Sequence, residues 1–389
     1  MAGAARRRSP YSLRVTDQRA DSASRLRRVE AINVRVPFRR PFLDVTGEFT
    51  HRPVWLLRTV DADGFEGLGE AALHPAASDA STAGLAALMR AMVPALIDGR
   101  PPSEADLLAE GEPGRAALAA LDGALGALAA SRGEAASGRA GGAGSAISVV
   151  ASIGFGGPDA GGESAAQAVE LGFETLRLRA GHERHTDHLV DRVRAVRAAI
   201  GPGPRLRIEV GGAWDLETAT ERIVAIERFG IEFVEQPLAN WDLAGHAALR
   251  ERVGVRIALD DSVDSEGGAS AAIAERAADV LVLRPARLGG SGPTLRIAHR
   301  AADAGVDVVL GAFFETGVGI AAALRIAARL GQGGPAHGLA TGGVLVHDLL
   351  AHPLPIERGT MAAPAAVTLD EDEVSRRAVE RVVGERQGD

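Results

Sequence analysis

Five charged residues recur along the second half of the chain at intervals of about one strand and one helix. They are Arg179, Glu209, Glu235, Asp260 and Arg284, and the intervals between them are 30, 26, 25 and 24 residues. Each ends a short apolar or β-branched run, a pattern that predicts a strand. Because the carboxyl ends of parallel barrel strands open on one face, we expect these side chains to converge. Their convergence predicts a site of chemistry.

The three acidic members of this set favour a metal ion. Carboxylates on adjacent strands make a hard oxygen site suited to Mg²⁺, which keeps waters and takes further ligands from a substrate. Such an ion would stabilise an enolate or a carboxylate dianion. We therefore predict that Glu209, Glu235 and Asp260 are metal ligands. The alternative is that these acidic side chains cap helices or face solvent.

A second arginine precedes Arg179 on the same predicted strand. Arg177 lies two residues before it, so both side chains point to the same side of the strand. Cations held inside a barrel need anions nearby. A second interpretation is therefore that the arginines neutralise the three carboxylates in an ion-pair network without metal.

The pattern of strands and helices that would position these residues predicts a β/α barrel. Short strands alternate with amphipathic helices, which is typical of parallel β/α architecture. We expect helices at 163–171, 186–200, 216–229 and 294–304, and eight strands at 147–152, 175–179, 206–210, 233–235, 257–260, 280–284, 308–310 and, more weakly, 336–339.

The first part of the chain has a different pattern. Residues 1–28 are arginine-rich and predict a disordered tail. Strand patterns at 32–36 and 54–69 and helical patterns at 80–97 and 104–130 predict an α+β domain over 29–140. A Gly/Ala/Ser-rich stretch, 133–145, predicts a linker. The barrel would then occupy 146–340, and 341–389 a C-terminal segment.

The composition narrows the kinds of partner. A net charge of −8 argues against a nucleic acid or an acidic membrane surface as partner. No cysteine is present, so disulfides, thiolate metal sites and thiol nucleophiles are excluded. No segment approaches the roughly 20 apolar residues of a membrane span. We expect a cytoplasmic protein that binds a small molecule, and a homo-oligomer is an open alternative.

Several motifs together resemble a known family. They are RIEVGGAWDLETA (207–219), VEQPL (234–238), IALDDS (257–262), VLRPARLGG (282–290) and GFEGLGEAALHP (64–75). Taken together in their order along the chain, these motifs resemble the muconate-lactonising branch of the enolase superfamily, most closely the o-succinylbenzoate synthases. The resemblance spans about residues 29–350.

The resemblance implies a fold and a reaction. The fold would be α/β, a modified TIM barrel of the (β/α)7β kind, closed by an N-terminal α+β capping domain towards which 341–389 returns. Mg²⁺ would be held at Glu209, Glu235 and Asp260. The family removes a proton α to a carboxylate, and lysines that end the second and sixth strands serve as acid/base groups. The loop Thr46–Gly47–Glu48–Phe49 would cover the substrate or form a plain surface turn.

The chain departs from the family at these lysines. Every one of its 43 basic residues is arginine, and Arg177, Arg179 and Arg284 stand at the lysine positions. Arginine keeps its charge near pH 7, so it can stabilise an anion but cannot act as a base. Another group must then move the proton, and Glu315, Asp261 and His182 are the candidates. A solvated loop is the alternative for His182.

Three functions follow. We favour a divergent lyase or cycloisomerase that acts on a small-molecule carboxylate through a metal-stabilised, enolate-like intermediate, with arginines in electrostatic roles. The second is a non-catalytic relative that binds an anionic ligand or a partner at the same barrel mouth. The third is a barrel with unrelated chemistry at another site.

Overall fold

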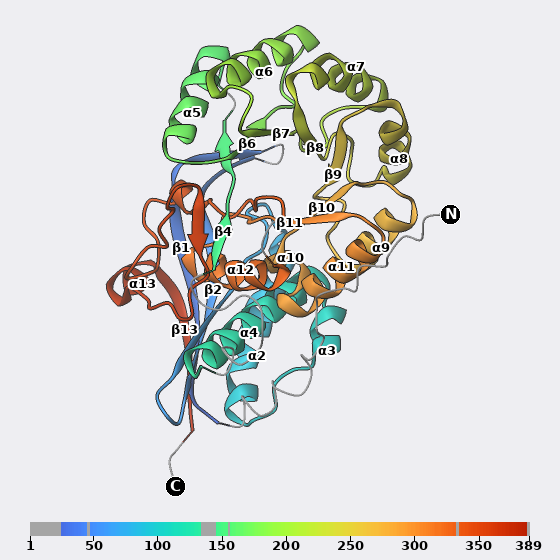
Figure 1. Ribbon diagram of the computed structural model, residues 1–389. Helices are drawn as coiled ribbons and strands as arrows, with labels where there is room; N and C mark the ends of the chain where they lie inside the picture. Colours follow the sequence, from blue (N-terminus) through green and yellow to red (C-terminus); the bar gives the residue numbers. More distant parts are fainter. Residues whose placement is uncertain (1–24, 45–46, 134–144, 155, 332–333, 387–389) are drawn as a thin grey trace.

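The computed structural model describes residues 25–44, 47–133, 145–154, 156–331 and 334–386. Figure 1 shows a curled sheet of parallel strands with helices around its outside, and below it a smaller part in which long strands lie beside helices. The fold is therefore an α/β barrel with an N-terminal domain built on an antiparallel sheet, as predicted.

The smaller part is built on a sheet of four strands in the order β13-β1-β2-β3. These strands are β1 (Leu26–Asp44), β2 (Gly47–Asp61), β3 (Glu66–Ala71) and β13 (Ala378–Glu385). Its helices are α2 (Asp79–Ile97), α3 (Glu104–Ala109) and α4 (Gly111–Ser131). The predicted tail, 1–28, lies outside the described residues except for its last four, where β1 already begins at Leu26. Most of the predicted linker also lies outside them.

Helix α4 packs closely on β3 because the strand carries glycine at the contact. A Cβ atom on Gly69 would lie 1.9 Å from the carbonyl oxygen of Ala120, and one on Gly67 would lie 2.1 Å from that of Ala124. No side chain fits in such a space. The two glycines therefore set the distance between the sheet and the helix.

Helix α2 corrects the expectation that no segment approaches a membrane span. By length and composition it could cross a bilayer. In the structure it packs against α4, β1 and β13 and buries Leu85, Met89, Met92, Val93 and Leu96. These side chains belong to the apolar core of the smaller part.

The barrel sheet has the strand order β11-β10-β9-β8-β7-β6-β5, so every strand lies next to its neighbour in sequence. The strands are β5 (Ala151–Ile153), β6 (Thr175–Arg179), β7 (Arg205–Glu209), β8 (Ile231–Glu235), β9 (Arg256–Leu259), β10 (Val280–Leu283) and β11 (Asp307–Leu310). The helices are α5 (Pro158–Glu170), α6 (Thr186–Ile200), α7 (Leu216–Ile226), α8 (Leu243–Arg252), α9 (Glu266–Ala274), α10 (Pro285–Leu288), α11 (Ser291–Asp303) and α12 (Gly317–Leu330).

Side chains alternate across these strands as a barrel requires. Leu176 and Leu178 of β6 are fully buried in the large cluster shared with the outer helices. Arg177 lies between them in sequence and lines a small cavity together with Val282 and Val309 of other barrel strands. The prediction that the arginines of β6 face the barrel interior is thus confirmed for Arg177.

The eighth predicted strand, 336–339, is wrong as a strand, although its residues close the barrel. His337 forms a single bridge with Val149, and Gly338 forms one with Gly311, both parallel. Each bridge spans one residue, because His337 hydrogen-bonds to the backbone of 148–150 and Gly338 to that of 310–312. The two edges of the seven-stranded sheet are therefore joined through one dipeptide.

The chain after the barrel returns to the smaller part. Strand β12 (Thr360–Ala362) pairs with β4 (Ala146–Ser148), and helix α13 (Glu371–Arg377) contacts β1. Strand β13 then pairs antiparallel with β1, with Arg28 opposite Glu385. Three strands that precede the barrel in sequence and one that follows it thus build one sheet.

Candidate active site

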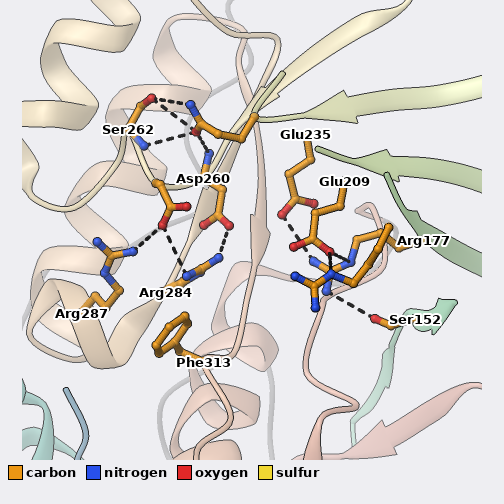
Figure 2. A network of polar contacts seen from close by, with 12 residues as sticks. Ser152, Arg177, Glu209, Glu235, Asp260, Ser262, Arg284, Arg287 and Phe313 are labelled. Atoms are coloured by element: carbon orange, nitrogen blue, oxygen red, sulfur yellow. Dashed lines mark hydrogen bonds and ion pairs between the residues drawn. The ribbon is translucent and has the colours of Figure 1, made fainter. Parts of the chain in front are cut away.

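The five recurring charged residues come together at the carboxyl ends of five adjacent strands. Arg179, Glu209 and Glu235 are the last residues of β6, β7 and β8, and the strand register places them side by side. Asp260 and Arg284 follow β9 and β10 directly. Figure 2 shows the resulting network in two halves, one around Arg177 and one around Arg284.

Arg177 is the centre of the first half. Its Nε lies 3.4 Å from Oε2 of Glu209, and its Nη1 lies 3.3 Å from Oε1 of Glu235. Its Nη2 donates to the hydroxyl of Ser152 on β5 at 3.3 Å. Burial lowers the pKa of Arg177, but the carboxylates of Glu209 and Glu235 more than offset this and raise it. The guanidinium thus remains charged and spans acceptors from three strands.

The two glutamates of this half have opposite pKa shifts. Burial alone would raise the pKa of Glu209, but Arg177 and Arg179 hold it below its ordinary value. Arg179 Nε lies 3.5 Å from Glu209 Oε2, and the Arg179 side chain is 32% exposed. Burial raises the pKa of Glu235, which is 2% exposed, and Arg177 offsets only part of that rise.

Arg284 is the centre of the second half. Its Nη2 forms a close ion pair with Oδ2 of Asp260, and its Nη1 lies 3.6 Å from Oδ1 of Asp261. Arg287 Nη1 lies 2.7 Å from the same Asp261 oxygen. The Arg284 guanidinium also lies over the ring of Phe313, 4.9 Å from its centroid. Figure 2 shows this half apart from the half around Arg177.

The neighbouring aspartates Asp260 and Asp261 have pKa values shifted in opposite directions. Burial raises the pKa of Asp260 well above its ordinary value, and Arg284 opposes that rise. Burial would also raise the pKa of Asp261, but Arg284 and Arg287 hold it below its ordinary value. Asp261, 42% exposed, is therefore an ionised carboxylate that solvent can reach.

The backbone that carries Asp260 is fixed by a residue of the neighbouring strand. Gln236 Oε1 accepts the Asp260 N–H at 2.9 Å and the Ser262 N–H at 3.3 Å. Gln236 Nε2 donates to the Ser262 hydroxyl at 2.9 Å. Gln236 itself has a φ of 45°, a left-handed conformation that is uncommon outside glycine. The turn after β8 thereby sets the position of the turn after β9.

The smaller domain reaches this site through Phe313. Its ring lies 4.7 Å from the ring of His74, and the guanidinium of buried Arg52 lies 5.6 Å from its centroid. The same Phe313 ring also contacts the guanidinium of Arg284 in the charged network. Phe313 therefore links the N-terminal domain to the charged network.

Other predicted candidates lie apart from the network. Glu315 is buried and accepts the Phe313 N–H at 2.6 Å, and its charge raises the pKa of Arg52, which burial lowers. His182 is 45% exposed, with Glu183 at 3.7 Å. Thr46 lies outside the described residues, whereas Gly47, Glu48 and Phe49 begin β2.

The predicted metal ligands are engaged by arginines instead of facing one another. Glu209 and Glu235 share Arg177, and Asp260 is paired with Arg284. Among the residues that the structure describes, no three acidic or histidine side chains are grouped to hold a metal ion. Glu209 Oε2 and Asp260 Oδ1 are buried without a hydrogen-bond partner, but the Glu209 oxygen is already ion-paired with Arg177 and Arg179. In this arrangement the residues do not fit a divalent ion.

Little free space remains inside the barrel beneath the network. A cavity of about 10 Å³ is lined by Arg177, Arg207, Glu235 and apolar side chains. This is close to the volume that one water molecule requires. A ligand must therefore contact the network from its exposed side, where Arg179 and Asp261 lie.

Sequence comparison connects the barrel with a known family. Residues 162–373 match the family described as Enolase C-terminal domain-like. An o-succinylbenzoate synthase of Thermobifida fusca is 40% identical over 199 residues, which cover 51% of this chain and 61% of that protein. An L-Ala-D/L-Glu epimerase of Clostridium acetobutylicum is 31% identical over 179 residues, which cover 46% of this chain and 49% of that protein. The chain thus spans about half to three fifths of these curated relatives.

Structural comparison extends the similarity to nearly the whole chain. A probable mandelate racemase of Alicyclobacillus acidocaldarius has a TM-score of 0.75 and 25% identity, covering 92% of this chain and 99% of its own. A dipeptide epimerase of Cytophaga hutchinsonii, solved with Mg and the dipeptide D-Ala-L-Val, has a TM-score of 0.76 at 22% identity, covering 92% and 99%. At that identity the second similarity concerns the fold.

Proposed function

The chain belongs to the enolase superfamily, and from this premise we propose that it is a divergent lyase or cycloisomerase that acts on a small-molecule carboxylate. The observation that carries the proposal is the convergence of Arg177, Arg179 and Arg284 at one end of the barrel. Guanidinium forks bind carboxylates with two parallel hydrogen bonds. The substrate carboxylate would bind at Arg179, the most exposed guanidinium of the first half.

The proposed chemistry is removal of a proton α to that carboxylate. The developing enolate carries extra negative charge, which fixed cations in a water-poor site stabilise. Arg284, paired with buried Asp260 and lying over Phe313, would supply this stabilisation. Arginine does not take the proton. Of the three candidate bases, Asp261 lies in the network and keeps an exposed carboxylate, so we assign the proton to it.

The family and the Mg-bound dipeptide epimerase favour Mg²⁺, whereas the ion-paired carboxylates of this chain do not fit it. The proposal takes no step through a metal, because arginines engage Glu209, Glu235 and Asp260. A cytoplasmic location and a homo-oligomeric state remain predictions from the sequence.

A second function is favoured by one observation about the proton acceptor. The lowered pKa of Asp261 makes its carboxylate a weak base near neutral pH. Glu315 is occupied by the Phe313 N–H, and His182 lies in an exposed loop. A relative that binds a carboxylate without turning it over would need none of these groups.

One experiment separates the two functions. The protein is incubated with a panel of carboxylates in D₂O, with and without Mg²⁺, and α-proton exchange is followed by NMR while binding is followed by calorimetry. Exchange that falls at least tenfold in Arg284→Gln and is unchanged in Arg205→Gln supports the enzyme, since Arg205 is 59% exposed at the start of β7. Binding without exchange supports the second function. If the protein shows no binding and no exchange, both functions are refuted.

A further inference from the structure

The guanidinium of Arg177 occupies the place beside Glu209 and Glu235 where a cation shared by these two carboxylates would bind. Each nitrogen of Arg177 has its own partner: Nε forms an ion pair with Glu209, Nη1 donates to Glu235 and Nη2 donates to Ser152. These partners come from β7, β8 and β5, so the guanidinium lies among strands on both sides of β6 (Figure 2). A cation shared by Glu209 and Glu235 would have to lie in the same place.

The charges of the network balance without any added ion. Its guanidinium groups are those of Arg177, Arg179, Arg284 and Arg287, and each forms an ion pair inside the network. Its carboxylates are those of Glu209, Glu235, Asp260 and Asp261, and each is paired in return. Four positive groups face four negative ones, so a divalent cation would add uncompensated positive charge.

From these contacts we infer that arginines, chiefly Arg177, are the resident cations of this carboxylate site, which therefore binds its ligand without a divalent metal. The inference concerns cation binding alone and holds whether or not the protein turns a carboxylate over. It replaces the predicted Mg²⁺ ligand roles of Glu209, Glu235 and Asp260 with ion pairs to arginine.

The chemistry of arginine makes the replacement stable. A Mg²⁺ ion needs carboxylate oxygens at about 2.0–2.1 Å in near-octahedral geometry. Arg177 already holds the Glu209 and Glu235 oxygens at 3.4 and 3.3 Å, and a metal bound to them would contact its guanidinium. Arginine cannot lose its proton to relieve that repulsion. The metal would have to displace a partly buried side chain from its partners on three strands.

Lysine would not block the site in the same way. Its single nitrogen on a flexible stem cannot span three acceptors as a planar fork does. Shortening Arg177 and Arg284 to lysine should therefore free oxygens of Glu209, Glu235 and Asp260 for a metal. Arg287 offers a matched control, because its ion pair is with Asp261 and not with a predicted metal ligand.

The test measures Mn²⁺ binding to the full chain by electron paramagnetic resonance and calorimetry, with no substrate present. We expect no stoichiometric binding at millimolar Mn²⁺ in the wild type or in Arg287→Lys. The double variant Arg177→Lys/Arg284→Lys should bind at least tenfold more tightly, and adding Glu235→Gln should abolish that gain. Circular dichroism confirms folding, and the single variants replace the double variant if it does not fold.

Two results overturn the inference. Stoichiometric Mn²⁺ binding by the wild type that is lost in Glu235→Gln would show that a metal shares the carboxylates with Arg177. Folded lysine variants that gain no Mn²⁺ affinity would show that arginine is not what occupies the cation position. Both readouts are independent of catalysis, so an inactive protein leaves the test intact.

Discussion

The carboxylate of Glu70 accepts the hydroxyl hydrogen of Thr316 at 2.5 Å, and this bond joins the N-terminal sheet to the barrel. Glu70 lies in β3, whereas Thr316 is the N-cap of α12. The same carboxylate accepts the backbone N–H groups of Thr316, at 3.1 Å, and Gly319, at 3.0 Å. A buried acid from one domain thus satisfies the first turn of a helix in the other.

This contact predicts a pH dependence of stability. Burial raises the pKa of Glu70 from 4.5 to about 8. The folded protein therefore holds a proton there that the unfolded chain releases, so the stability contribution is complete below pH 4.5 and is lost as pH rises through about 8. Glu70→Gln should flatten this decline in urea unfolding measured between pH 4.5 and about 8. Glu217→Gln, at an 82% exposed side chain, should leave the slope unchanged, and equal slopes in all three proteins would contradict the assignment.

Buried Arg207 should contribute strongly to barrel stability. Its Nε donates to Glu232 at 2.6 Å, its Nη1 donates to the carbonyl of Ala336 at 2.7 Å, and it lies 4.5 Å from the Phe233 ring centroid. Arg207→Met removes the donor to the buried Ala336 carbonyl and leaves Glu232 with only the longer contact to Arg205, at a cost of about 3 kcal/mol in unfolding free energy. Arg205→Ala, which also removes a partner of Glu232 but from an exposed position, should cost under about 0.5 kcal/mol. Similar losses in both variants would contradict this prediction.

Close packing of β3 on α4 predicts a severe effect from one methyl group. The Cβ of Gly69→Ala would lie 1.9 Å from the Ala120 carbonyl oxygen, which forces the helix away from the sheet. We expect a loss of about 3 kcal/mol, measured by thermal and denaturant unfolding. The control is Gly126→Ala in α4, where a Cβ meets nothing within 4 Å. That change should stabilise the protein by up to about 1 kcal/mol.

The ion pair of Arg284 and Asp260 should be strongly coupled. Arg284→Met leaves the buried Asp260 carboxylate without its cation, at a cost of about 3–5 kcal/mol. Asp260→Asn leaves Arg284 with only its longer contact to Asp261, at a cost of about 1–3 kcal/mol. The double variant should cost less than the sum by about 1–3 kcal/mol in a double-mutant cycle. The exposed pair of Arg300 and Glu266, at 3.3 Å, should give under about 0.5 kcal/mol in the same cycle. Additive losses at the buried pair would show that the two residues act separately.

The sequence pattern predicts most of the barrel because its strands are short, apolar and evenly spaced. Strand β6 spans the residues expected of it, and strands β7 to β11 lie within two residues of expectation. The strand expected at 147–152 is divided in the structure into β4, which pairs with β12, and β5, which belongs to the barrel sheet. The strand expected at 336–339 fails because His337 and Gly338 each pair with only one neighbour. A pattern based on side-chain alternation cannot detect a closure made by two backbone bridges.

The arrangement within the site was harder to predict. Strand ends locate Arg179, Glu209 and Glu235 correctly, because register alone brings them together. The turn of Gln236 depends on a left-handed backbone that its sequence does not specify. Arg287, three residues after Arg284 on α10, could have been found from helical spacing.

The pairing of β1 with β13 also sets an order of assembly during synthesis. Arg28 lies opposite Glu385, so the outer edge of β1 has no partner until residues 378–385 have been made. During translation, domains usually fold as units in the order in which they leave the ribosome. Here the domain that comes first in sequence is completed last, after the whole barrel has been synthesised. The nascent chain must therefore keep a long strand edge from aggregating throughout the synthesis of the barrel.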